Sequence, residues 1–564
     1  MRYVYWVLTV ILSLGSLSGC GGGDLTEESK PIVLNRSIVM NDVDDVQIVG
    51  EANEAHLEVS LGDTPKDLYL VLSNAGTLNI SPDITINGKK VTAESQPERR
   101  QVDTTVPAFP VILPAPRRIT DWHVSQLHDQ NRSSKTVMEK PQAKVLLRSA
   151  KEVGDSESFY LETRSSDGSV AATLRKVVAD IETQYGAKTL NIWVADDSYG
   201  NCGKTVCVQD DDIEALADNF LKAGGDNDIY DWVTNVYGEE WGADAQSHND
   251  EVIGEKDVID ILLLDIDADN KKDGGVLGYF YPKDAYKRSD VSGSNERIMF
   301  YIDAVMFAND DTSKIDWKKE TFATLAHEFQ HMIHFYQKEI KKGIVDDTWI
   351  NELLSESTED LVATKIGHTG PRGVDPDDGS AGSPGNTLGR YPLFNYYDDS
   401  SLTSWGNTMV DYSVVNAFGA FLLRNYGGAK ILHDIMYRGE GHEEAIEEAT
   451  GKSFGTLMAQ WGAAVLLSDQ VRSSWEPMTY NTGDFRETTY GSITYRLGSI
   501  NFYNYTLEGA YGDGANGPKV YTDDVWVQRA GADLYYRVGR NLDGTVPIDI
   551  TGLNRNTVIT LITK

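Results

Sequence analysis

The pentapeptide His327-Glu328-Phe329-Gln330-His331 constrains this chain more than any other feature of its sequence. Residues four apart lie on one face of a helix, so His327 and His331 can bind the same metal ion. Zinc takes neutral imidazoles and, in catalytic sites, one further protein ligand plus an open position for water. A carboxylate beside that water can accept its proton, and Glu328 stands where such a group is needed. The spacing therefore predicts a catalytic zinc site.

The residues around the pentapeptide predict that it lies in the middle of a buried helix. Asp316 can cap the start of that helix, and Gly343 follows a lysine-rich end. Between them runs an apolar stripe made of Trp317, Leu325, Phe329, Met332 and Ile333.

The residues after His331 exclude one arrangement of the third ligand. A metzincin would continue with Gly and His where this chain has His334 and Gln337. After twenty intervening residues His331 is followed by Glu352, in a segment from Trp349 to about Lys365 that has the apolar spacing of a second buried helix. That helix presents Glu352 and Glu356 on one face. The pattern gives His334 no role.

The two predicted helices together resemble the gluzincin metallopeptidases, in which a first helix carries HExxH and a second carries Asn-Glu-x-x-Ser-Asp/Glu. Within that clan the chain most resembles the hyicolysin family of secreted neutral metallopeptidases, over about residues 155–470. Besides the two helices, the resemblance rests on the segments Leu190-Asn191-Ile192-Trp193-Val194, Asn227-Asp228-Ile229-Tyr230, Gly278-Tyr279-Phe280-Tyr281 and Tyr426-Gly427-Gly428.

This resemblance implies roles for individual residues. It makes Glu352 the third zinc ligand and Glu356 the carboxylate that orients a ligand histidine. The alternative for Glu356, and for Glu359, is the solvated face of a helix. The resemblance also implies a donor to the oxyanion from a later helical subdomain, for which Tyr412 is our candidate, with His433 and His442 as others.

The resemblance implies an α+β, zincin-like catalytic domain: a zinc helix, a glutamate helix and a helical lower subdomain. We expect a zinc endopeptidase that acts on proteins or peptides through a water activated by zinc, with Glu328 as general base. Three alternatives stay open: a surface adhesin with a vestigial site, an aminopeptidase of the same clan, and a hydrolase of another amide.

The first residues predict export and lipidation. An apolar run follows Arg2 and ends in Leu17-Ser18-Gly19-Cys20, which indicates a lipoprotein signal peptide over residues 1–19. Cys20 would then carry the lipid, and residues 20–30 would form a flexible tether. We expect a bacterial cell-envelope protein, at the outer membrane in a diderm, that touches the membrane only through its anchor. An ordinary secretory signal is the alternative.

The net charge bears on the partners of the protein, and the cysteine content bears on its disulfides. The net charge of −35 leaves no basic patch for nucleic acid, which we exclude as a partner. Cys202 and Cys207 are the only cysteines after Cys20, and in an exported chain they predict a small disulfide-closed loop.

Changes in composition divide the chain into domains. Residues 31–93 alternate apolar and polar positions, which predicts a small β domain. Residues 94–152 are rich in proline, which predicts a linker or a propeptide arm, and cleavage within this segment is a hypothesis. The peptidase domain takes residues 153–475, and residues 476–564 return to alternation, which predicts a separate β-sandwich-like accessory domain.

Within the peptidase domain the pattern alternates between helix and strand. Helices are predicted near Val170–Tyr185, Ile213–Ala223, Val410–Tyr426, Ala429–Met436 and Ser453–Ser468, and strands at Thr189–Val194, Val258–Leu264, Gly278–Tyr281 and Arg297–Ile302. We expect Tyr279–Tyr281 to be an edge strand that pairs with the substrate backbone.

An acidic turn follows the second of these strands. Asp265, Asp267 and Asp269 alternate in it, as oxygen ligands of calcium do, but the EF-hand pattern fails because Asn270 replaces its turn glycine and Val276 its bidentate glutamate. An acidic surface turn and a calcium site both stay open.

Overall fold

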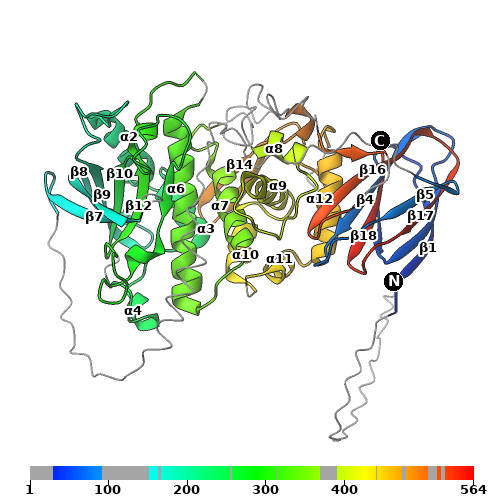
Figure 1. Cartoon of the computed structure of the whole chain (residues 1–564), viewed down its shortest axis with the longest axis horizontal. Helices are drawn as coiled ribbons and strands as arrows, with labels where there is room; N and C mark the ends of the chain where they lie inside the picture. The colour runs from blue at the N-terminus through cyan, green and yellow to red at the C-terminus, as the bar shows by residue number, and fades with distance from the viewer. Residues whose placement is uncertain are drawn as a thin grey trace, which may run out of the picture.

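The computed structural model describes residues 30–91, 151–162, 167–254, 257–313, 315–368, 390–439, 441–472, 478–505, 517–522 and 527–564. The predicted signal peptide, the lipidation site Cys20 and nearly all of the segment 94–152 lie outside these residues. Figure 1 shows three parts along the long axis of the molecule: a mixed sheet with helices, a helical layer in the middle, and a β-sandwich.

The first part is built on a six-stranded sheet with the order β11-β12-β10-β9-β8-β7. Strands β9, β10 and β12 are parallel, and β11 closes one edge antiparallel to β12. The strands are β7 (Ser156–Glu162), β8 (Asp167–Thr183), β9 (Gly186–Ala195), β10 (Val258–Leu264), β11 (Gly278–Phe280) and β12 (Ile298–Asp303). The predicted strands of this domain are therefore present, and Tyr279 does lie on an edge strand.

The helix predicted over Val170–Tyr185 is wrong, because this segment is the long strand β8. It pairs antiparallel with β7 and β9, and its register with β9 shifts twice, between Leu174 and Lys176 and between Val178 and Ile181. Each shift resets the alternation of side chains between the two faces. The apolar residues then recur at spacings of three and four, which resembles the period of a helix.

Helices cover one face of this sheet. They are α2 (Asp210–Phe220), α3 (Ile229–Tyr237), the short α4 (Ala245–His248) and α5 (Ala304–Phe307), and α6 (Trp317–His334), which continues as the π-helical segment η2 (Phe335–Ile340). Phe220, Phe300 and Phe329 join α2, β12 and α6 in an aromatic cluster with ring centroids 5.4–5.9 Å apart. Asp316 caps α6 as predicted, since its side chain accepts from Lys319 N. Gly343 ends this helical stretch with φ +67°.

The middle layer is helical, as expected for the lower subdomain. Its helices are α7 (Thr348–Val362), α8 (Arg390–Tyr396), α9 (Met409–Asn425), α10 (Ala429–Tyr437), α11 (Glu443–Thr450) and α12 (Phe454–Leu466), with short 3₁₀ turns at η1 (Pro282–Ala285) and η3 (Phe502–Asn504) elsewhere in the chain. The hairpin β13 (Arg486–Tyr490) and β14 (Ile493–Leu497) packs between both groups of helices, because Tyr495 Oη donates to Trp232 O on α3 at 2.6 Å and Arg424 Nε on α9 donates to Gly498 O at 2.9 Å. The peptidase part thus extends beyond the boundary predicted at residue 475.

The predicted division into separate N-terminal and C-terminal β domains is wrong, because both segments build one sandwich. One sheet has the order β1-β3-β17-β5-β6 and the other β15-β16-β4-β18-β2, so each sheet contains strands from both ends of the chain. Alternating apolar residues predict strands but not their partners. The strands are β1 (Val33–Val39), β2 (Val46–Glu51), β3 (Glu54–Ser60), β4 (Lys66–Asn74), β5 (Asp83–Ile86), β6 (Lys89–Lys90), β15 (Val520–Tyr521), β16 (Ala532–Leu542), β17 (Thr545–Thr551) and β18 (Thr557–Thr563).

Helix α12 packs directly on the second sheet of the sandwich. Two glycines permit the close approach: a Cβ on Gly455 would stand 3.0 Å from Val558 Cγ2, and one on Gly462 would stand 2.8 Å from Val71 Cγ1. Val71, Tyr535 and Ile562 of the sandwich belong to the same hydrophobic core as the zinc-helix residues Phe329 and Met332. The sandwich and the peptidase part therefore share a continuous core.

Two further predictions concern the chain as a whole. Cys202 and Cys207 form a disulfide, as predicted. None of the helices in the described ranges is both long enough and apolar enough to cross a membrane.

Candidate metal centre

Three predicted ligands meet where α6 packs against α7. His327 Nε2 and His331 Nε2 are 3.1 Å apart, and Glu352 Oε2 lies 3.4 Å from the first and 3.5 Å from the second. Zinc–nitrogen and zinc–oxygen bonds of about 2.0–2.2 Å in a tetrahedron give ligand atoms roughly 3.3–3.6 Å apart. The triangle therefore has about the size of one face of a tetrahedral zinc site.

The far nitrogen of each imidazole is held by α7. His327 Nδ1 donates to Glu359 Oε1 at 2.8 Å, and His331 Nδ1 donates to Asn351 Oδ1 at 3.1 Å. Each contact fixes the tautomer that leaves Nε2 available to a metal. The helix therefore supplies one ligand and orients the other two.

The role predicted for Glu356 is filled by Glu359 instead. Glu356 is fully buried, so it is not on a solvated helix face, but its carboxylate pairs with Arg390 and accepts from Asn416 Nδ2 at 2.8 Å. Glu359 lies two turns beyond Glu352 and reaches His327. The spacing in the sequence leaves both carboxylates on the face of Glu352, and packing against α8 and α9 decides between them.

Glu328 lies between the ligand triangle and the edge strand β11. Its Oε2 accepts from Phe280 N at 2.9 Å, while Oε1 is buried and has no hydrogen-bond partner within the described structure. Burial raises the pKa of Glu328. A carboxylate with one anchored and one unused oxygen, and a raised pKa, is suited to accept and return a proton.

The donor set fits a zinc ion. Glu352 Oε2, like Glu328 Oε1, is a buried oxygen that accepts no hydrogen bond from the described residues, and a cation between the ligands would satisfy it. Burial alone would oppose ionisation of Glu352, but the neighbouring imidazoles lower its pKa to about 2. Two imidazoles and one ionised carboxylate are a ligand set of catalytic zinc sites.

Tyr412, at the start of α9, is buried beside this centre. Its ring packs edge-on against Trp405 at 4.9 Å, and the Arg390 guanidinium carbon lies 5.5 Å from its centroid. Burial, and then the charges of Glu352, Glu356 and Glu328, raise its pKa well above the usual range, so the hydroxyl keeps its proton. That hydroxyl has no partner in the part of the chain described. The structure thus places a free donor near the carboxylates of the centre.

The remaining histidines lie in other contacts. His334 is buried and its Nε2 pairs with Asp346 at 2.8 Å. His433 binds Val236 O through Nδ1, and His442 pairs with Asp347 in an exposed position. None of the three belongs to the described residues that could jointly hold a metal at this centre.

The acidic turn does not gather its carboxylates around one point. Asp265 is bound by Lys204 Nζ at 2.8 Å and by the backbone N–H groups of Asp269 and Asn270. Asp269 pairs with Lys271. Asp265, Asp267 and Asp269 do not form one of the converging acidic or histidine groups within the described residues.

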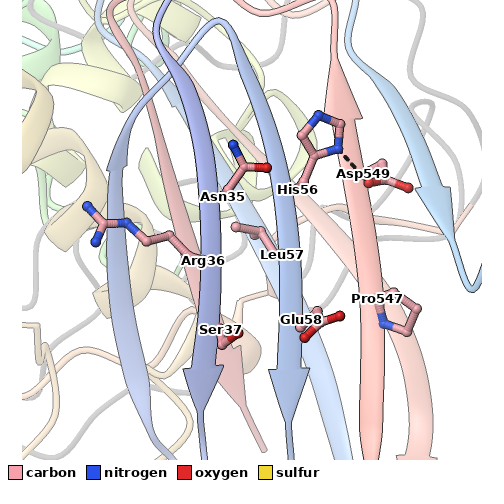
Figure 2. A pocket seen from close by; sticks show the side chains of 8 residues that line it. All are labelled: Asn35, Arg36, Ser37, His56, Leu57, Glu58, Pro547 and Asp549. Carbon is pink, nitrogen blue, oxygen red and sulfur yellow. Dashed lines mark hydrogen bonds and ion pairs between the residues drawn. The ribbon is translucent and has the colours of Figure 1, made fainter.

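A hollow lies on the outer face of the sandwich, away from the metal centre. It has a volume of about 360 Å³, and its floor is formed by β1, β3 and β17 (Figure 2). His56 on this floor pairs with Asp549 at 2.7 Å and with Glu54 at 3.0 Å. The polar groups thus satisfy one another, and we assign this hollow no function.

Comparisons with known proteins agree with the geometry of the centre. Residues 167–465, more than half of the chain, match the model of the family described as Peptidase M30. The chain belongs to the peptidase M30 family. This confirms the predicted resemblance to the hyicolysin group, and the matched range of the M30 domain contains α6, α7 and Tyr412.

Two individual proteins can be named beside the M30 family. The neutral metalloprotease ShpI of Staphylococcus hyicus is 30% identical over 185 residues, which cover 32% of this chain and 36% of that protease. The chain thus matches about a third of that relative's length. A solved two-domain M1 zinc metallopeptidase bound to L-tryptophan aligns with 11% identity and a TM-score of 0.26, over 56% of this chain and 57% of that one.

Proposed function

We propose that this M30 protein is a zinc endopeptidase that hydrolyses peptide bonds of extracytoplasmic proteins. The observation that carries the proposal is the triangle of His327, His331 and Glu352, with the unused oxygen of Glu328 beside it. Membership of the family and the likeness to a neutral metalloprotease support the same chemistry.

Each residue of the centre has its own proposed role in peptide hydrolysis. His327, His331 and Glu352 would hold the zinc ion, which lowers the pKa of a water toward about 7 and polarises the scissile carbonyl. Glu328 Oε1 accepts a proton from the attacking water and returns it to the leaving amine. Tyr412 Oη donates a hydrogen bond to the carbonyl oxygen as negative charge develops on it. No covalent intermediate with the enzyme is required.

Endopeptidase action is favoured by the strand beside Glu328. An enzyme that captures a free N-terminus needs an acidic group for the ammonium. The segment Gly278-Tyr279-Phe280-Tyr281 offers three aromatic residues and no carboxylate. Phe280 N already binds Glu328, and an edge strand can bind an extended peptide through its free backbone groups. We therefore propose an open cleft that accepts internal bonds.

The predicted signal sequence supports an activity outside the cytoplasm. We propose a lipid anchor on Cys20 as the only contact with the membrane, and proteins or peptides of the envelope or its surroundings as substrates. The mass of the mature N-terminal peptide after export tests the anchor, because a diacylglycerol on Cys20 adds several hundred daltons that an ordinary secreted form lacks.

The experiment that tests the function uses two substrate sets. A quenched peptide blocked at both ends and a series of aminoacyl amides with free N-termini are incubated with the full-length protein, before and after zinc removal by a chelator. We expect cleavage of the blocked peptide, its loss with the chelator, and its return with added zinc. Cleavage of the aminoacyl amides alone would make the protein an aminopeptidase. Zinc binding without any cleavage would favour the alternative of a surface adhesin with a vestigial site.

A further inference from the structure

Two buried carboxylates lie beside His327, although one is enough to accept the hydrogen bond from its Nδ1. Ligand atoms of His327, Glu356 and Glu359 all lie within 4.8 Å of one another, and all three residues are buried. Glu359 accepts from His327 Nδ1. Two anions this close repel each other, and a buried anion without a partner is unstable. Something must therefore hold Glu356 in place beside Glu359.

Arg390 meets this requirement. Its Nε donates to Glu356 Oε2 at 2.9 Å and its Nη2 donates to Glu356 Oε1, so both carboxylate oxygens are engaged by one guanidinium. Asn416 adds a third donor. The side chain of Arg390 is only 3% exposed, which means that the pair exchanges little with water. A planar fork of this kind fixes direction as well as charge.

We propose that Arg390 is a positioning residue of the metal centre: by holding both oxygens of Glu356, it leaves Glu359 as the carboxylate that orients His327. The proposal rests on the proposed function only in that the centre binds zinc. Without Arg390, the buried Glu356 would keep Asn416 as a donor but lose the fork that engages both oxygens, and His327 lies within 4.8 Å of it. The imidazole would then be shared between two carboxylates, and Nε2 would lose its fixed direction toward the metal.

A second buried arginine gives a matched control. Arg424 on α9 donates to Asp360 on α7, with Nη1 at 2.6 Å from Oδ2 and Nη2 at 3.4 Å from Oδ1. It is fully buried and joins the middle-layer helices as Arg390 does, but its hydrogen bonds in the described structure go to Asp360 and to backbone carbonyls, away from His327 and Glu359. Its loss should lower stability without a direct effect on the ligands.

The test measures zinc affinity by competition with a chelator in full-length Arg390→Met, Arg424→Met and the double variant Arg390→Met with Glu356→Gln. We expect Arg390→Met to bind zinc about 10- to 100-fold more weakly, as loss of groups that orient a ligand does. Arg424→Met should stay within about threefold of the parent, and the double variant should recover most of the affinity, because its Gln carries no charge to compete for His327.

Parent-like zinc affinity in folded Arg390→Met would overturn the proposal. An equal loss in Arg424→Met would overturn it too, because the effect would then be general destabilisation. If Arg390→Met fails to fold, the double variant decides the question. A zinc affinity near that of the parent supports the proposal, and a zinc affinity as low as that of Glu352→Ala, which lacks one of the three ligands, refutes it. Zinc affinity does not depend on cleavage, so a failure of the peptidase proposal would appear separately, as a parent that binds zinc and cleaves nothing.

Discussion

At the residue scale, some polar atoms of the metal centre are hydrogen-bonded to the protein and others are not. Both far nitrogens of the ligand histidines are hydrogen-bonded, whereas Glu328 Oε1, Glu352 Oε2 and Tyr412 Oη have no hydrogen-bond partner in the described structure. Unpaired buried polar atoms are costly in a folded protein. Three of them at this centre fit the proposed binding of a metal, a water and a carbonyl oxygen.

The unused hydroxyl of Tyr412 gives a residue-scale prediction. Tyr412→Phe should lower kcat about 100-fold or more and change KM little, because the lost hydrogen bond forms only as charge develops on the substrate oxygen. Steady-state kinetics on a blocked peptide measure both constants. Tyr391→Phe is the control, since Tyr391 is also buried with a hydroxyl lacking a described partner but lies near Asp360 and Arg424. Equal losses in the two variants would remove Tyr412 from the mechanism.

The sequence predicted the groups that do chemistry better than those that orient them. His327 and His331 stand four apart on one helix, so helical geometry brings them together, whereas the role of Glu352, on the second helix, is what the family resemblance implies. Glu359 was not predicted as the partner of His327, although it lies seven residues after Glu352 and thus on the same face. The choice between Glu356 and Glu359 depends on Arg390, which comes from a helix 34 residues away from Glu356 in the chain.

At the element scale, the position of β11 against α6 connects the sheet to the general base. A Cβ on Gly278 would stand 2.8 Å from Ile302 Cδ1, 3.0 Å from Tyr301 O and 3.1 Å from Thr324 Cγ2. A side chain there would push β11 away from β12 and from the zinc helix. Phe280 N, two residues on, would then leave Glu328 Oε2.

Gly278→Ala therefore should lower kcat/KM about 10-fold, since small displacements of catalytic groups are costly. Gly225→Ala is the matched control, because a Cβ on Gly225 meets no atom within 4 Å. Both variants are compared by peptide hydrolysis and zinc content. A loss of zinc in Gly278→Ala would contradict the account, because none of the three ligands lies on β11.

Strand β8 marks the limit of prediction at this scale. Periodicity correctly predicted α6, α7, α9, α10 and α12, whose apolar residues follow one regular helix each. The strand fails the same test because its two register shifts give a spacing of three and four. A bulge is set by the neighbouring strands, and that information is absent from the local sequence.

At the scale of the whole molecule, the first and last strands of the chain form one sandwich. Strand β4 lies between β16 and β18, and β3 lies between β1 and β17, so residues 30–91 supply interior strands to both sheets. Because helix α12 of the peptidase part packs on the second of these sheets, the N-terminal strands contribute to the core that the sandwich shares with the peptidase part.

This arrangement predicts the result of cleavage between the sandwich strands and the peptidase part. A protease site inserted between residues 100 and 140 and cut in the purified protein should yield two fragments that co-elute on size exclusion. They should separate only in denaturant, because interior strands are held by the pairing on both sides. Release of the N-terminal fragment under native conditions would make residues 30–91 a dissociable propeptide and contradict the account.

A buried acid at the contact between the sandwich and α12 predicts a pH dependence. Asp533 on β16 has no hydrogen-bond partner for either oxygen among the described residues, and burial raises its pKa from 3.8 to about 8. Between these values the unfolded chain ionises Asp533 and the folded protein keeps it protonated. Its effect on stability is absent below about pH 4 and grows unfavourable as the pH rises to about 8.

Asp533→Asn should therefore gain stability over the parent as the pH rises, by up to about 4 kcal/mol between pH 5 and pH 8. Denaturant unfolding at pH 5 and pH 8 measures the difference. Asp543→Asn, in an exposed turn after β16, should show no such trend. A gain from Asp533→Asn that is the same at both pH values would show that Asp533 is ionised in the folded protein.

The most direct test of the account compares the full-length protein with Glu328→Gln for zinc per chain and for hydrolysis of a blocked peptide. We predict one zinc per chain in both proteins, because Glu328 is not a ligand, and a loss of activity of about 10³-fold or more in the variant. An active Glu328→Gln would contradict the assigned general base, and a parent that is active without zinc would contradict the metal centre itself.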